Sequence, residues 1–169
     1  LSTRDTVLIE TPASRETSLM VARNVIPPEL RGRCRMVALA SIVQREARSI
    51  DEMPTISAVY RNRLMKRMRL EADPTVQYAH GRETGDWMKG MRYKHLEIDS
   101  PYNSYMYFGL PPGPICSPGV DAIQAALAPA AADYLYFVAE GDTGRHIFSR
   151  TLVEHNAAIA RVKKLKKPG

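Results

Sequence analysis

Apolar side chains recur at spacings of three and four residues along residues 36–47, which predicts an amphipathic helix over about 35–48. Glu46 falls inside this apolar stripe, within two turns of Leu39 and Val43. A carboxyl at such a position must either be paired or have a function. Because burial disfavours the charged form, Glu46 can keep its proton near neutral pH and act as a general acid.

The rest of the chain consists of short elements separated by proline and glycine, without internal repeats. Helices are expected where a capping residue or a proline precedes a helical apolar pattern, and strands where β-branched and aromatic residues lie between turn residues. The further expected elements are a strand at 6–9, helices at 18–24, from 51, from 73, at 117–128 and from 151, and strands at 134–139 and 145–149. Strands and helices do not alternate as in a parallel sheet. The pattern therefore predicts an α+β fold, helix-rich with a small antiparallel hairpin.

Two helix starts depend on particular residues. Asp73 precedes Pro74, and because aspartate caps free amides while proline suits the first helical position, Asp73 is expected to cap a helix. Thr151 and Glu154 have the spacing of a capping box, which is expected to start the C-terminal helix.

Composition indicates an ordinary globular protein. With 169 residues, of which 44% are hydrophobic and 25% charged, the chain can form one domain with its own core. We expect an N-terminal entry segment, residues 1–34, followed by the domain proper, residues 35–169. The net charge of +6 suits an anionic partner. Much of the excess, however, lies in the run 161–167, which is typical of a solvated helix end.

Several classes of protein are disfavoured. Cys34 and Cys116 allow one disulfide but no framework, and the histidines lack metal-ligand spacing, so we expect no metal. Without a phosphate-binding glycine loop or a nucleophile-elbow serine, we expect no cofactor. No apolar run reaches the roughly 18 residues of a membrane helix. Because the first residue is Leu1 and not methionine, we expect a fragment of a longer chain, from which an anchor could be missing.

Carboxylates are then the remaining candidates for catalysis, and each has a structural alternative. Asp73 is more typical of a helix cap than of a catalyst. Glu46 can form a structural ion pair with Arg63 or Arg45 at the edge of the core. Residue spacing does not decide between an ion pair and a general acid for Glu46.

Eight short blocks occur in order over roughly two-thirds of the chain, from Leu39 to Asn156. They are LASIVQRE at 39–46, NRL and MRL within 62–70, DPTV with Tyr78 at 73–78, SPYNSY at 100–105, GLPPGPI at 109–115, PG at 118–119, YLYFVA at 134–139 and EHN at 154–156. Together they resemble the catalytic domain of the YceG-like family of endolytic murein transglycosylases. In that family the last glutamate of the first block is the catalytic acid, and here it is Glu46.

The resemblance implies that residues 35–169 cleave peptidoglycan glycan strands between N-acetylmuramic acid and N-acetylglucosamine. The cut falls within the strand, uses no water and leaves a 1,6-anhydro end. Such a lyase needs one carboxyl that acts first as an acid and then as a base, whereas ordinary glycosidases need two. The resemblance also implies a place at the outer face of the cytoplasmic membrane in the bacterial envelope, with cell-wall synthesis proteins as further partners. Family members usually carry a transmembrane helix and a LysM-like domain first, and residues 1–34 match neither.

The same blocks supply candidate substrate-binding residues. Aromatic rings stack on sugars, and amides bond to hydroxyl and acetamido groups. The candidates of this kind are Tyr78, Tyr102, Asn103 and Tyr105. Tyr102 is equally suited to the core.

Charged and helix-start residues complete the candidate list. Arg63 is expected to orient Glu46 or to bind a peptide-stem carboxylate, with a structural pair to Asp73 as the alternative. Asp73 itself belongs to a family block and is a candidate for substrate binding. His155 and Asn156 either line the site or only cap and pack the last helix.

Some positions depart from the family pattern, and other functions remain open. Gln44 stands where a second glutamate is common, Glu71 where glutamine is usual, and Ser117 where asparagine is often found. The alternatives are a non-catalytic peptidoglycan-binding scaffold with a structural Glu46, and a hydrolytic muramidase. Nucleic-acid binding is motivated only by charge and is not expected.

Overall fold

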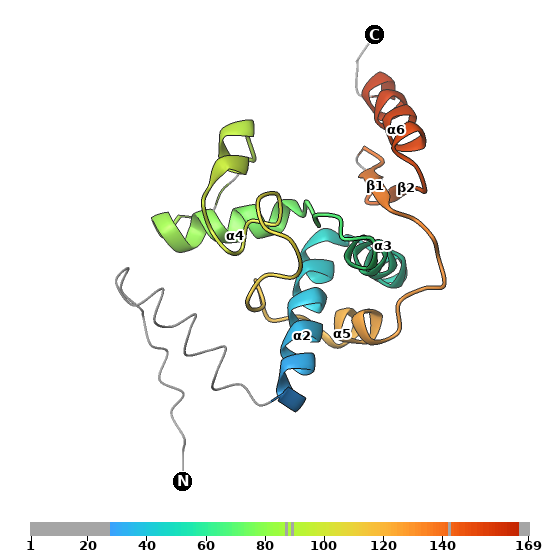
Figure 1. The fold of residues 1–169 in the computed structure, drawn as a ribbon. Coiled ribbons are helices and arrows are strands. Elements are labelled where there is room, and N and C mark those ends of the chain that lie inside the picture. Colours follow the sequence, from blue (N-terminus) through green and yellow to red (C-terminus); the bar gives the residue numbers. More distant parts are fainter. Residues whose placement is uncertain (1–27, 87, 89, 142, 166–169) are drawn as a thin grey trace. The chain divides into compact units, whose positions relative to one another are not determined.

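The computed structural model describes residues 28–86, 88, 90–141 and 143–165. In chain order its elements are α2 (Pro28–Glu46), the 3₁₀ helix η2 (Ile50–Glu52), α3 (Met53–Met65), α4 (Asp73–Thr84), the 3₁₀ helix η3 (Tyr93–Glu97), α5 (Val120–Leu127), β1 (Tyr136–Ala139), β2 (His146–Ser149) and α6 (Leu152–Leu165) (Figure 1). Five α-helices and one two-stranded sheet within these ranges confirm the predicted α+β fold. No helix among the described residues is long and apolar enough to cross a membrane.

The first described helix is longer than the sequence pattern predicts. Helix α2 begins at Pro28 and not near residue 35, because proline suits the first turn of a helix, where its missing amide hydrogen is not needed. The strand expected at 6–9 and the helix expected at 18–24 lie outside the described residues. The residues from 33 onward belong to one compact unit, and the boundary between residues 1–34 and 35–169 stays a prediction.

The stretch of α2 from Ala38 to Val43 is buried on all sides. No residue from Ala38 to Val43 is more than 6% exposed, as expected for a helix that other elements surround. The core cluster joins this part of α2 to buried residues of α3 and α5, among them Ile56 and Ala122. Glu46, the last residue of α2, therefore stands where a central helix leaves the core.

The proline-rich loop at residues 98–119 is fastened to α2 by two polar side chains. The backbone N–H of Ile115 donates to the Ser41 hydroxyl at 3.0 Å, and that of Gly119 donates to Gln44 Oε1 at 2.9 Å. Ser41 is fully buried. Gln44, one of the departures from the family pattern, thus holds the end of this loop in place.

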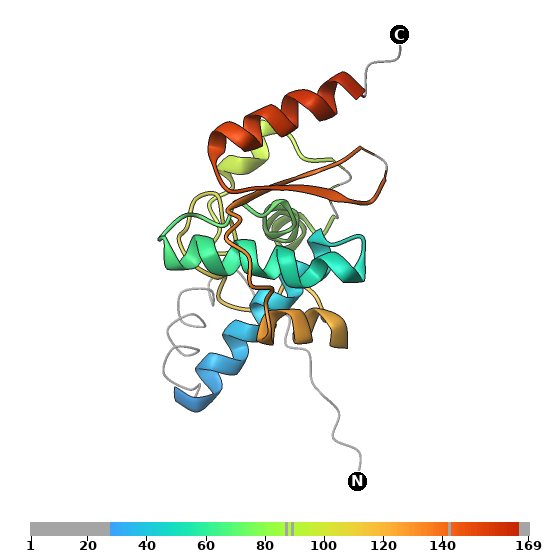
Figure 2. The ribbon, with the colours of Figure 1, turned by 90° about the vertical axis from the view of Figure 1, so that its right-hand side faces the viewer.

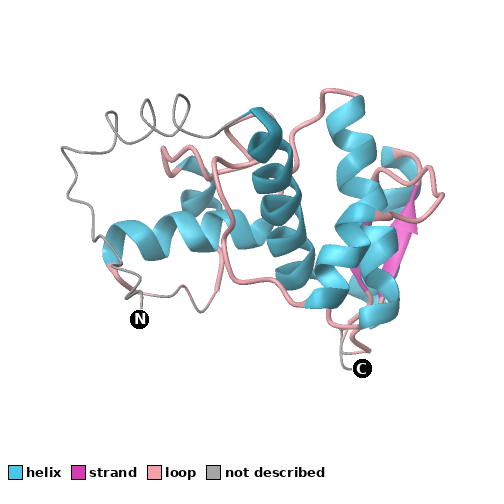
Figure 3. Ribbon diagram, turned by 90° about the horizontal axis from the view of Figure 1, so that it is seen from below, coloured by secondary structure: helices cyan, strands magenta, loops and turns pink. Residues whose placement is uncertain are grey.

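The hairpin and the last helix form a layer at one edge of the helical part (Figures 2 and 3). Strands β1 and β2 are antiparallel, with Tyr136 opposite Ser149 and Ala139 opposite His146, which confirms the predicted hairpin with slightly shorter strands. Helix α6 packs on both strands. The predicted capping box at its start is present, because Glu154 N–H donates to the Thr151 hydroxyl at 3.2 Å.

Candidate active site

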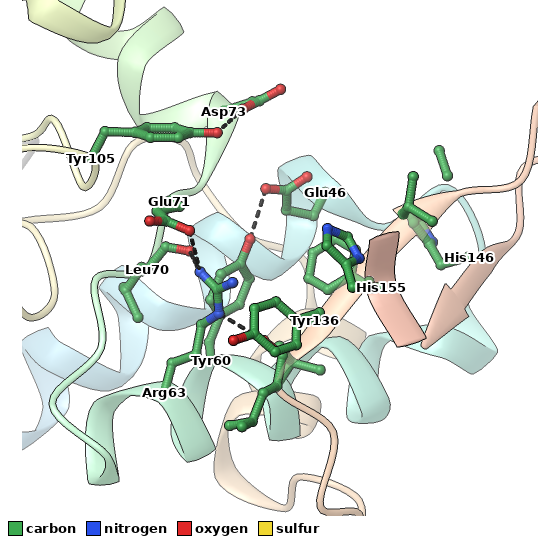
Figure 4. A pocket seen from close by; sticks show the side chains of 15 residues that line it. Glu46, Tyr60, Arg63, Leu70, Glu71, Asp73, Tyr105, Tyr136, His146 and His155 are labelled. Carbon is green, nitrogen blue, oxygen red and sulfur yellow. Dashed lines mark hydrogen bonds and ion pairs between the residues drawn. The ribbon is translucent and has the colours of Figure 1, made fainter. Parts of the chain in front are cut away.

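A pocket of about 330 Å³ lies between the end of α2, α3, the segment before α4, and the hairpin layer (Figure 4). Its polar lining consists of acids, tyrosines, an arginine and two histidines from distant parts of the chain: Glu46, Tyr60, Arg63, Glu71, Asp73, Tyr105, Tyr136, His146 and His155. The remaining wall is apolar and comes from α3, Leu70, Leu135 and β1. Five of the nine predicted site residues meet here, namely Glu46, Arg63, Asp73, Tyr105 and His155.

Glu46 lies on the pocket wall, neither fully buried nor exposed. The Tyr60 hydroxyl donates a hydrogen bond to its Oε1 at 2.7 Å. Burial is the main cause that raises the pKa of Glu46 from 4.5 to about 7; the Tyr60 hydrogen bond opposes the rise, and the negative charge of Asp73 adds to it. A substantial fraction of Glu46 is therefore protonated near neutral pH, as the sequence pattern predicts.

Arg63 is buried, and its hydrogen bonds link α3 to the segment before α4 and to the segment before β1, not to Glu46. Its Nε donates to the Leu135 carbonyl at 2.7 Å, and its Nη1 lies 3.1 Å from both the Arg69 carbonyl and Glu71 Oε2 and 2.9 Å from the Leu70 carbonyl. The guanidinium also lies 5.1 Å from the centre of the Tyr136 ring. The alternative interpretation of Arg63, a structural pair with Asp73, is wrong, because Glu71 is the carboxylate that Arg63 binds.

Glu71 has a backbone conformation that residues other than glycine rarely adopt. Its φ is 52°, in the left-handed region, and its N–H donates to the Ser104 carbonyl at 3.2 Å. The ion pair with Arg63 and this backbone bond fix the segment that leads into α4. The family departure at residue 71 thus places a carboxylate on the pocket wall, neutralised by a buried arginine.

Asp73 does not cap α4 as the Asp-Pro sequence predicts. The N-cap position belongs to Ala72, without a side-chain hydrogen bond, and Asp73 is the first helical residue. Its carboxylate instead accepts a hydrogen bond of 2.5 Å from the Tyr105 hydroxyl. Burial and this bond to Asp73 raise the pKa of Tyr105, so the hydroxyl keeps its proton. Asp73 thus places a negative charge beside Glu46.

The two histidines of the pocket differ in their partners. His155 stacks on the Tyr136 ring, with 5.2 Å between ring centres, and burial together with the charge of Arg63 lowers its pKa. Its Nδ1 is buried without a hydrogen-bond partner among the described residues. His146 Nδ1 lies 2.8 Å from Glu52 Oε2, which ties the hairpin to η2. His155 thus contributes to the pocket lining through its ring, whereas Asn156 next to it is exposed and outside the lining.

Three further candidates lie outside the pocket lining. Tyr78 and Tyr102 contact each other with 4.8 Å between ring centres, and Arg82 lies 5.2 Å from the Tyr102 ring. Asn103 is fully buried, donates to the Leu96 and Ile98 carbonyls at 2.9 and 2.8 Å, and accepts from the Tyr105 N–H at 3.0 Å. Asn103 thus shapes the loop that brings Tyr105 to the pocket, while substrate binding by these three residues stays a prediction.

Sequence reasoning missed four polar residues of the pocket, Tyr60, Glu71, Tyr136 and His146. Tyr60 falls on the apolar face of α3, where its spacing indicates only packing, and no sequence signal marks its hydroxyl. The sequence marks Glu71 only as a departure from the family pattern, because its pairing with Arg63 depends on a left-handed backbone conformation. No sequence signal marks His146, because its partner Glu52 lies 94 residues away in the chain.

Several known proteins have sequences similar to this chain. The profile of the YceG-like family matches residues 13–161. An endolytic murein transglycosylase of Bacillus subtilis is 44% identical over 124 residues, which are 73% of this chain and 33% of that protein. One of Streptococcus pneumoniae is 32% identical over 127 residues, 74% of this chain and 23% of that protein. The chain thus spans about a third or less of these relatives.

A solved structure extends the similarity to the fold. The crystal structure of a yceG-like protein from Listeria monocytogenes matches with a TM-score of 0.67 and 40% sequence identity, over 85% of this chain and 45% of that one. The two proteins are thus similar both in sequence and in backbone fold. Together with the family profile, which matches well over half of the residues, it shows that the chain belongs to the YceG-like family.

Proposed function

We propose that this chain carries the catalytic site of an endolytic murein transglycosylase, a lyase that cuts peptidoglycan glycan strands internally and without water. The observation that carries the proposal is Glu46, a carboxyl on a pocket wall whose pKa is raised to about 7. It is also the residue that corresponds to the catalytic acid of the family block. The names of the Bacillus and Streptococcus relatives support the same activity.

The proposed reaction uses Glu46 twice. Protonated Glu46 gives its proton to the glycosidic oxygen, and the bond from that oxygen to C1 of the muramyl sugar breaks. The carboxylate then takes the proton of the C6 hydroxyl as its oxygen forms a new bond to C1, which leaves a 1,6-anhydro ring and restores the acid. A pKa near 7 suits both steps, because the acid and the carboxylate forms of Glu46 are then similar in free energy at neutral pH.

The other carboxylates of the pocket support a single-acid mechanism. A hydrolase needs a second carboxylate that is free to attack C1 or to activate water. Glu71 is engaged by Arg63 at 3.1 Å, and Asp73 accepts the Tyr105 hydroxyl at 2.5 Å. Asp73 then acts mainly through its charge, which adds to the rise that burial causes in the pKa of Glu46 and favours the positive charge that develops on the sugar.

The test compares the wild type with Glu46→Gln on purified glycan strands, with mass spectrometry of the products. We expect internal cuts with anhydro ends from the wild type and a loss of about a thousandfold or more in Glu46→Gln, since the amide cannot give a proton. The matched control is Glu83→Gln, an exposed glutamate on α4, which should cut as the wild type does. Products one water heavier would show a hydrolytic muramidase. Wild-type activity in Glu46→Gln would refute the acid role, and an inactive wild type that binds strands would favour the scaffold.

The expected location of the protein in the cell depends on the same proposal. A murein transglycosylase has to reach its glycan strands, so we expect it at the outer face of the cytoplasmic membrane, next to cell-wall synthesis proteins. Fractionation of cells, with an antibody against this chain, tests the location independently of activity.

A further inference from the structure

Tyr60 is held rigidly within the core. It is 2% exposed, and its ring meets Phe137 of β1 edge to face, with 5.9 Å between the ring centres. A buried tyrosine normally finds a partner for its hydroxyl. Here the hydroxyl reaches the pocket and donates to Glu46 Oε1 at 2.7 Å (Figure 4).

A single hydrogen bond of this kind makes the two oxygens of Glu46 different. The tyrosine hydroxyl has one hydrogen, and a neutral carboxylic acid has one oxygen that accepts and one that carries the proton. When Oε1 accepts from Tyr60, the proton of Glu46 belongs on Oε2. The same bond also persists when Glu46 is charged, because a carboxylate oxygen accepts more strongly than a neutral one.

We propose that Tyr60 is a positioning residue, whose hydroxyl fixes the Glu46 carboxyl so that Oε2 carries the proton to the substrate and takes the next one back. The catalytic consequence depends on the proposed function, whereas the pairing of Tyr60 with Glu46 can be tested without any activity. The ring stays fixed by Phe137, so the carboxyl does not have to be reoriented between the two proton transfers.

The charges around this pair set the direction of the pH effect. Asp73 from α4 faces Glu46 and disfavours its charge, and the Tyr105 hydroxyl lies next to Asp73. Arg63 from α3 lies near Tyr60. The pocket is completed by Glu71, which Arg63 binds, and by His146 and His155 of the hairpin layer. Among the causes that shift the pKa of Glu46, only the Tyr60 hydrogen bond favours the carboxylate, so its removal raises this pKa further.

The decisive experiment titrates Glu46 by carbon NMR of labelled glutamate carboxyls, with Glu46→Gln used for assignment. In Tyr60→Phe, which keeps the ring, we expect the titration midpoint of Glu46 to rise by about one pH unit above the wild type. The matched control is Tyr107→Phe, because the Tyr107 hydroxyl also donates to a carboxylate, Asp99, at 2.6 Å but lies outside the pocket lining. It should leave the midpoint unchanged. An unchanged midpoint in folded Tyr60→Phe would overturn the proposal.

A second measurement needs only the wild type and Glu46→Gln, and it applies even if Tyr60→Phe does not fold. With labelled tyrosine, the ring carbon that bears the Tyr60 hydroxyl should change its chemical shift with the same midpoint as Glu46. This change should be absent in Glu46→Gln. A Tyr60 chemical shift that does not change as Glu46 titrates would refute the pairing.

Glycan cleavage then separates positioning from mere packing. In Tyr60→Phe we expect kcat to fall by about tenfold or more with little change in KM, and the loss of activity at high pH to begin about one pH unit later. A purely structural role would leave the pH profile in place. If the NMR shift appears but the wild type cuts no strands, the proposed function fails and the pairing stands. If cleavage needs Glu46 and Tyr60→Phe keeps the wild-type rate and profile, the positioning role fails.

Discussion

Replacing Glu46 by glutamine should make the protein more stable at high pH, even though it removes the proposed acid. Glutamine has nearly the same shape, and its side-chain oxygen can still accept the Tyr60 hydroxyl that Glu46 binds at 2.7 Å. It carries no charge, and therefore avoids the cost of holding a carboxylate in the pocket next to Asp73. The effect on the free energy of unfolding should depend on pH in a defined way.

The magnitude follows from the pKa of Glu46. Folding raises it from 4.5 to about 7, which at about 1.4 kcal/mol per pH unit corresponds to about 3.5 kcal/mol. Because Glu46 is only partly buried, solvent screening reduces this cost to about 2 to 3 kcal/mol. Below pH 4.5 the folded and unfolded chains both hold the proton, so Glu46 costs nothing. Between pH 4.5 and 7 the unfolded chain has lost the proton and the folded protein still holds it, so stability falls as pH rises. Above pH 7 the full cost is present.

Urea denaturation followed by circular dichroism, repeated from pH 4 to pH 8, measures this difference. We expect wild type and Glu46→Gln to be nearly equal at pH 4, and the variant to be about 2 to 3 kcal/mol more stable at pH 8. The exposed Glu83→Gln on α4 serves as the control, and its difference from the wild type should be small and nearly constant. A constant difference for Glu46→Gln, or a variant less stable than the wild type at pH 8, would refute the reasoning.

Three further substitutions test the framework of the pocket. Arg63→Lys should lower the free energy of unfolding by about 3 kcal/mol, because an ammonium group cannot replace the guanidinium that binds three carbonyls and Glu71. The control in the same urea experiment is Arg61→Lys on the exposed side of the same helix, which should change the free energy of unfolding little. Arg67→Gly should raise the melting temperature, with a gain of about 0.5 to 1 kcal/mol, because residue 67 has a φ of 53° that glycine adopts at no steric cost; a loss of stability would contradict this. Ser41→Ala should cost about 2 kcal/mol, because the buried N–H of Ile115 loses its partner, and amide hydrogen exchange at residue 115 should speed up in parallel.

The fold was largely predictable because its elements carry local signals. The apolar period of α2, the proline at the start of α3 and the alternation of the hairpin each indicate one kind of element. The sequence pattern predicts a start of α2 that is too late, because the first turns of the helix lack the apolar period that defines the rest. Asp73 shows the opposite error: the local Asp-Pro signal predicts a cap, but a tertiary bond from Tyr105 takes the carboxylate.

The site was predictable only where a residue conflicts with its local pattern. Glu46 stands out because a charged side chain in an apolar stripe needs a reason. Tyr60 does not stand out, since tyrosine suits an apolar helix face, and its pairing with Glu46 joins residues 14 positions apart on different helices. The role of Arg63 depends on the Leu135 carbonyl, 72 residues away. Such pairings follow from the packing of whole elements, which no local spacing reveals.

The pocket draws its walls from residues 46 to 155 of the chain, including the hairpin near the C-terminal end, and this bears on when the protein becomes active. The pKa of Glu46 is raised mainly by burial, so it is a property of the completed fold and not of the residue. In a chain whose hairpin layer has not yet docked, water reaches the carboxyl and its pKa returns to the ordinary range. Glu46 is then ionised at neutral pH and has no proton to give. On the proposed function, a newly made chain cannot cleave glycan strands until its last elements have folded, so that folding itself times the onset of cleavage.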